Sequence, residues 1–76
     1  MKPIALKKLK KYLTSKGCYC KRVKSSHEIW DKKDNSLDRP IILDNNYPDV
    51  PLLHMQTNLR TLGISFKDFE NEIKNF

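Results

Sequence analysis

The chain has 76 residues, 38% of them hydrophobic and 32% charged, which suffices for one core, so we predict a single domain over residues 1–76. No apolar run approaches the roughly 20 residues that cross a bilayer, and no signal-peptide core follows Met1-Lys2, which predicts a cytoplasmic protein without membrane contact. The net charge of +6 is uneven, because residues 1–33 carry eleven Lys and Arg against two Asp and Glu, whereas residues 34–76 carry four against seven. The basic half favours contact with a polyanion, although lysines that only keep a domain soluble give the same composition.

The first predicted element is an amphipathic helix near the start of the chain. Leu6, Leu9 and Leu13 recur at helical spacing, lysines occupy the other sides, and Gly17 ends the pattern. The apolar side is expected to pack on the domain. The basic side either faces solvent or forms part of a surface that binds RNA.

A hairpin and a third strand are predicted next. β-Forming residues at 18–23 and again at 27–31 flank the small pair Ser25-Ser26, so the two runs can pair back on each other. After a polar loop, residues 39–44 form a third strand, with Pro40 tolerated at its start or on an edge.

Two helices are predicted after the strands. Apolar residues at 52, 55, 59 and 62 form a stripe that Gly63 ends, and the pair Ser65 and Asp68 resembles a capping box at the start of a last short helix. The predicted fold class is therefore α+β in the order α-β-β-β-α-α, with helices on one face of a small three-stranded antiparallel sheet.

The residue types exclude most enzyme classes. The sequence has no glycine-rich phosphate loop and no Ser-His-Asp spacing, and Cys18 and Cys20 are too few for a zinc site, so we predict no metal and no cofactor. Two cysteines one residue apart in a strand are also too distant for an unstrained disulfide, and we expect reduced thiols.

His27 is the candidate catalytic residue. It opens the second predicted strand, and an imidazole among cations that hold a phosphate is a plausible general acid or base for cleaving RNA. An ordinary surface histidine would look the same in the sequence. The predicted RNA-binding residues around it are Arg22, Lys24, Ser25, Ser26, Lys32 and Lys33.

Strand alternation makes a geometric prediction about this histidine. His27 and Ile29 should lie on one face of the sheet and Glu28 and Trp30 on the other, unless a bulge at Ser25-Ser26 shifts the register. If Trp30 packs under the helices, His27 faces solvent. The other histidine, His54, is expected to be a solvent-facing residue in the first turn of its helix.

Two segments resemble the HicA family of toxin ribonucleases. One is the strand Ser26-His27-Glu28-Ile29-Trp30, and the other is the helix end Thr57-Asn58-Leu59-Arg60-Thr61-Leu62-Gly63-Ile64-Ser65. The resemblance implies a fold like that of double-stranded RNA-binding domains, cleavage of mRNA by one histidine at the position of His27, and neutralisation by a HicB-like antitoxin. It also implies a reaction that needs no metal.

The chain departs from the family pattern at Ser25, where HicA-like proteins usually have glycine, and in the connection over residues 45–50, which supplies no second catalytic histidine. Because a serine adds a Cβ and a hydroxyl, RNA contact could survive while turnover falls. A non-catalytic RNA-binding module of the same fold therefore stays open as an alternative. The third alternative is a protein-binding domain whose basic half binds an acidic partner.

Overall fold

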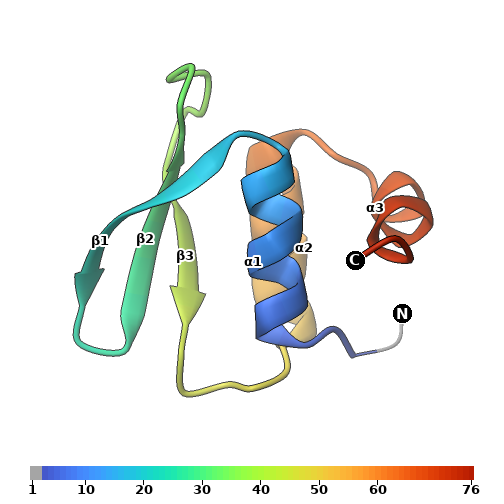
Figure 1. Cartoon of the computed structure of the whole chain (residues 1–76), viewed down its shortest axis with the longest axis horizontal. Helices are drawn as coiled ribbons and strands as arrows, with labels where there is room; N and C mark the ends of the chain where they lie inside the picture. Colours follow the sequence, from blue (N-terminus) through green and yellow to red (C-terminus); the bar gives the residue numbers. More distant parts are fainter. Residues whose placement is uncertain (1–2) are drawn as a thin grey trace.

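The computed structural model describes residues 3–76, so residues 1 and 2 of the predicted domain lie outside the described residues. The structure is α+β, as predicted, with three helices and a three-stranded antiparallel sheet in the order β1-β2-β3. Figure 1 shows the helices gathered on one side of the sheet. The elements are α1 (Leu6–Ser15), β1 (Cys18–Lys24), β2 (His27–Lys32), β3 (Ile41–Asp44), α2 (Leu52–Leu62) and α3 (Phe66–Ile73).

One hydrophobic core lies between the sheet and the helices. Its largest fully buried side chain is Tyr12 of α1, whose ring meets Phe69 of α3 edge-on with 5.0 Å between ring centroids. The Tyr12 hydroxyl donates to Glu72 Oε1 at 2.9 Å, so the polar end of this ring is satisfied. Burial, together with this hydrogen bond, raises the pKa of Tyr12 above its usual range.

The predicted stop and start signals of α2 and α3 are confirmed. Gly63 adopts φ 72°, a left-handed conformation that glycine tolerates best, and it ends α2. The Ser65 hydroxyl then accepts a hydrogen bond from the Asp68 backbone N–H at 3.1 Å and caps α3. These two signals set the direction of the last helix, whose Phe69 and Ile73 are buried.

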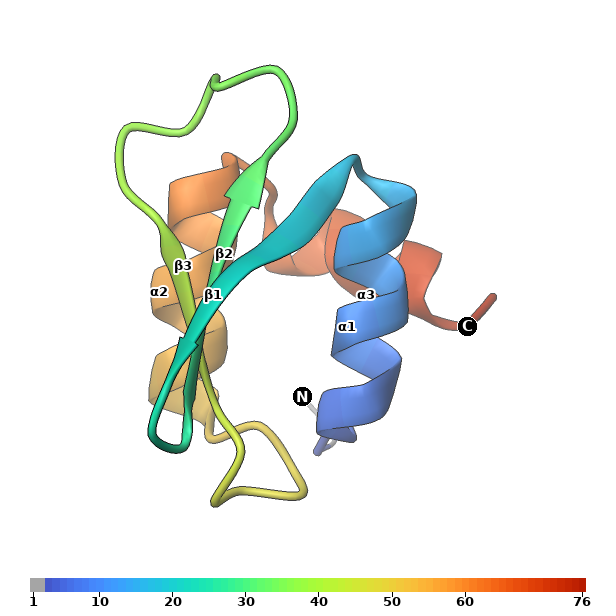
Figure 2. The ribbon, with the colours of Figure 1, turned by 60° about the vertical axis from the view of Figure 1, so that its left-hand side comes forward.

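α2 runs alongside the edge strand β3, as Figure 2 shows. The buried Asn58 of α2 donates from Nδ2 to the backbone oxygen of Ile42 at 3.3 Å. This bond satisfies an edge-strand carbonyl that has no further strand to pair with. It also holds α2 against the end of the sheet that carries the histidine.

Strand β1 contains a bulge that the sequence did not locate. Cys20 lies opposite Trp30 of β2. Arg22 lies opposite Ile29, which leaves Lys21 as an extra residue between the two pairs. The bulge reverses the side-chain alternation, so the first half of β1 can place Cys20 on the helix side while the second half places Arg22 on the other side.

The face prediction for β2 is confirmed. Trp30 is buried under the helices, and the side chain of His27 is 51% exposed. We call the side of the sheet away from the helices the open face. Its residues on the three paired strands are Arg22, Lys24, His27, Ile29, Ile42 and Asp44.

The hairpin turn holds Ser25 in a conformation that suits glycine. Ser25 has φ 57°, while Ser26 is not among the residues with positive φ. A positive φ at only the first of two turn residues is the pattern of a type II′ turn, which prefers glycine there. The serine therefore keeps the turn that a glycine would make.

We expect Ser25→Gly to stabilise the chain by about 0.5–1 kcal/mol, because relief of the left-handed strain exceeds the extra entropy of an unfolded glycine. Urea unfolding of the two proteins measures the difference. Ser26→Gly is the matched control and should destabilise by about 0.5–1 kcal/mol, since no positive φ is relieved there. Equal shifts in both variants would show that Ser25 is unstrained.

Candidate active site

His27 stands at the first position of β2, next to the hairpin turn. It lies opposite Lys24 of β1 on one side and opposite Asp44 of β3 on the other. Its Nε2 is 3.5 Å from Asp44 Oδ2, and the Asp44 side chain is only 15% exposed. The structure thus gives the exposed imidazole a carboxylate partner, which the sequence did not reveal because it depends on the β2–β3 register.

The loop after β3 fixes Asp44 and the hairpin turn relative to each other. Asp44 Oδ1 accepts a hydrogen bond from the Asn46 backbone N–H at 2.9 Å. The Asn46 side chain donates to Ser26 Oγ at 3.0 Å, and the Asn45 backbone N–H donates to the Ser26 carbonyl at 2.8 Å. Hydrogen bonds within the chain therefore hold the carboxylate and the backbone beside His27 in place. The Ser26 hydroxyl is already engaged as an acceptor, and Ser25 is exposed.

Glu28 connects this end of the sheet to α1. Its carboxylate accepts hydrogen bonds from Lys10 Nζ at 2.7 Å, Asn45 Nδ2 at 2.9 Å and Trp30 Nε1 at 3.0 Å. The hydrogen bond from Lys10 is the largest of the contacts that lower the pKa of Glu28 to about 2. The carboxylate is thus charged at neutral pH and anchors the site to the core.

The structure brings only some of the predicted RNA-binding cations to His27. Lys24 is its direct cross-strand neighbour, and Arg22 is diagonal to it on the open face. Both are exposed, and neither forms an ion pair within residues 3–76.

Lys32 and Lys33, which could reach His27 only if the loop after β2 turned back toward it, lie elsewhere. Lys32 ends β2 at the opposite end from His27, roughly 16 Å away along the strand. Its ammonium is 3.9 Å from Asp34, and the Lys33 backbone N–H donates to Gly17 at 2.9 Å. The loop after β2 therefore turns away from the histidine.

A cleft of about 320 Å³ opens beside His27 between β3 and α2. Its lining residues are His27, Arg39, Pro40, Ile42, Asp44, His54, Thr57, Asn58 and Thr61. Such a volume is at the lower end of ligand-binding pockets, and its walls combine apolar and polar side chains.

His54 lines the same cleft and is not the simple solvent-facing residue that we expected. It is half-buried, and its ring meets Tyr47 edge-on with 5.5 Å between ring centroids. Two imidazoles thus share one cleft although 26 positions separate them in the sequence. Only the packing of α2 against β3 brings them together.

No protein-family model matches the sequence, and no match was found among curated proteins or solved structures. Within residues 3–76, no group of three or more His, Cys, Asp or Glu side chains is arranged to hold a metal ion. No helix in that range combines the length and apolar character that crossing a bilayer requires.

Proposed function

We propose that the chain is a HicA-like toxin, a metal-independent endoribonuclease that cleaves mRNA in the cytoplasm with His27 as its catalytic residue. One observation carries the proposal. His27 is exposed at the wall of a cleft, with Asp44 on one side and the cations Lys24 and Arg22 on the other. The α+β fold with helices on one side of the sheet supports a likeness to double-stranded RNA-binding domains.

The proposed chemistry uses His27 as a general base. Asp44 faces Nε2 and favours the tautomer that carries its proton there, which leaves Nδ1 to accept the proton of a ribose 2′-hydroxyl. The 2′-oxygen then attacks the adjacent phosphorus, and the bond to the 5′-oxygen breaks. The products are a 2′,3′-cyclic phosphate and a 5′-hydroxyl, the latter protonated by the histidine or by water.

Lys24 and Arg22 have an electrostatic role in this proposal. Both are exposed on the open face near His27, and their charges would stabilise the extra negative charge on the phosphorane oxygens. One positioned acid–base group contributes about 10²–10⁴-fold in rate, so we expect slow cleavage with weak sequence preference. A slow enzyme is sufficient for a toxin that acts on a pool of messengers.

Serine at position 25, where HicA-like proteins usually have glycine, keeps the hairpin turn on which the proposal depends. Ser25 adopts the positive φ that glycine would adopt, and the turn remains tied to the Asn45-Asn46 loop. Binding without turnover, as in an RNA-binding module of the same fold, is the outcome that would displace the enzymatic proposal.

We expect the purified chain to cleave single-stranded RNA in the presence of EDTA. A matched oligonucleotide in which every ribose lacks its 2′-hydroxyl should stay intact, because the attacking group is missing. Gel separation of end-labelled products measures both. Cleavage of the deoxy strand, or cleavage that EDTA abolishes, would contradict the proposed chemistry.

The proposed protein partner is a HicB-like antitoxin. A protein that neutralises the enzyme has to cover His27 or exclude its substrate, so the open face is the expected contact. An interface of ordinary size would bury roughly 1,200–2,000 Å² in total. The exposed Ile42 and the half-buried Ile29 on that face offer apolar area for such a contact.

A further inference from the structure

A second cleft continues from the one beside His27. It measures about 310 Å³ and is lined by Asp38, Arg39, Thr57, Arg60 and Thr61. Arg39, Thr57 and Thr61 line both clefts, so the two form one groove along the seam between α2 and the segment before β3. The groove leads from His27 at one end to Arg60 at the other.

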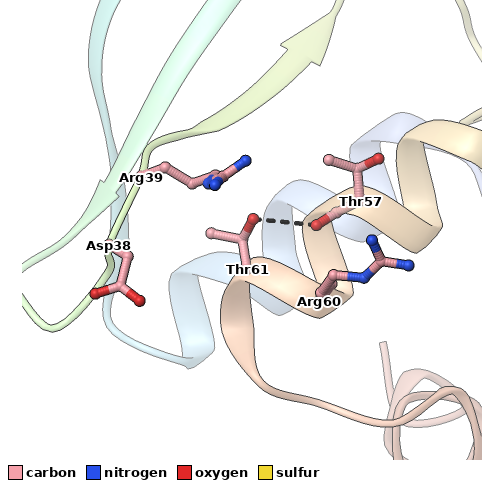
Figure 3. Close-up of a pocket in the computed structure, with 5 residues that line it drawn as sticks. All are labelled: Asp38, Arg39, Thr57, Arg60 and Thr61. Atoms are coloured by element: carbon pink, nitrogen blue, oxygen red, sulfur yellow. Dashed lines mark hydrogen bonds between the residues drawn. The ribbon is translucent and has the colours of Figure 1, made fainter.

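Two arginines line this second cleft, and in Figure 3 the guanidinium group of Arg60 points away from Arg39. Figure 3 shows Arg39 reaching from the segment before β3 toward α2, and Arg60 extending from α2. Both side chains are exposed, and neither has an ion-pair partner in the part of the chain that the structure describes. The planar guanidinium group of arginine is suited to phosphate oxygens. Two arginines without an ion-pair partner among the described residues, both at one cleft, therefore favour an anionic ligand.

The remaining walls fit a nucleotide better than a free inorganic anion. The hydroxyls of Thr57 and Thr61 donate to the helix carbonyls of Leu53 and Thr57, at 3.0 and 3.1 Å. In Figure 3 their oxygens are turned toward α2 and their methyl groups toward Arg39, which would suit contact with a sugar or a base and not with a phosphate oxygen. Asp38 also lies at this cleft, and in Figure 3 its carboxylate points away from both guanidinium groups.

We propose that the cleft formed by Arg39 and Arg60 is a phosphate subsite, which holds the backbone of single-stranded RNA one or two nucleotides from the phosphate at His27. The inference rests on the proposed function, because it continues the path of the same strand. It assigns RNA contact to Arg39 and Arg60, for neither of which the sequence predicted that role. Lys32, at the far end of β2, and Lys33, which follows it, line neither of the two clefts.

The test measures binding in a His27→Gln background, so that the RNA stays intact. Fluorescence anisotropy with a labelled single-stranded oligonucleotide should show affinity about 10- to 100-fold weaker after Arg39→Gln and Arg60→Gln together. The slope of log K against log salt should fall by about 1.4, since two phosphate contacts are lost. Neutralising Asp38 with Asp38→Asn should act in the opposite direction and strengthen binding.

Lys67→Gln with Lys74→Gln is the matched control, because it removes two positive charges from α3 and its C-terminal cap, and neither lysine lines the groove. Unfolding midpoints of all variants show that each is folded. If the arginine pair and the lysine pair weaken binding equally, or if the parent does not bind RNA, the subsite is overturned. Cleavage is measured separately with the chain that keeps His27. The subsite can therefore be overturned while cleavage is observed, and cleavage can be absent while the subsite binds RNA.

Discussion

Replacing His27 with alanine is expected to lower the rate of RNA cleavage by about 10²–10⁴-fold, while RNA binding changes less than threefold. The reason is that the imidazole is the proposed proton acceptor, whereas the groove and the nearby cations provide the affinity. The rate is measured under single-turnover conditions with excess protein and a labelled oligonucleotide. Binding is measured by anisotropy with a strand that lacks 2′-hydroxyls.

Lys33→Gln provides the comparison for this substitution. Lys33 is exposed at the opposite end of the sheet from His27, so its loss should leave the cleavage rate within about twofold despite the lost charge. A His27→Ala protein that cleaves at the parental rate would remove the assigned role. A rate lost equally in both variants would point to electrostatic attraction of RNA and not to general base catalysis.

Replacing Glu28 with glutamine is expected to destabilise the chain by about 1–3 kcal/mol at neutral pH, because the charged acceptor of three hydrogen bonds is lost. The lowered pKa of Glu28 sets the direction in which stability changes with pH. The folded carboxyl has a pKa of about 2, below its ordinary value of 4.5, so its contribution is complete above pH 4.5 and is lost as pH falls toward 2.

Urea unfolding at pH 7 and at pH 3 measures this contribution. The parent should lose stability between the two values, and the Glu28→Gln protein should lose less. Glu70→Gln on the exposed side of α3 serves as the control and should follow the parent. Parallel losses in the parent and the Glu28 variant would show that the Lys10 contact does not hold this carboxylate charged.

The secondary structure could be predicted because each element has a local cause. The leucine spacing of α1, the glycine that ends α2 and the serine cap of α3 act within a few residues, and the structure has each element where these signals place it. The exposed face of His27 followed from simple alternation along β2, with Trp30 as the buried reference.

The rest of the site depends on contacts between distant segments. Asp44 faces His27 only through the β2–β3 register, and His54 reaches the same cleft only because α2 packs along β3. Lys24 and Lys33 are both within a few residues of His27 in the sequence, but whether Lys33 reaches it depends on the course of the loop. Strand geometry separates them, because one faces the histidine across the hairpin and the other follows the far end of β2.

The chemical identity of the new 3′ ends tests the central claim most directly. RNA is incubated in EDTA with the parent chain and with the His27→Gln protein, and the fragments are weighed by mass spectrometry. The account predicts 2′,3′-cyclic phosphate ends from the parent and almost none from the variant over the same time. Fragments ending in a 3′-hydroxyl, or equal yields of cyclic phosphate from both proteins, would contradict it.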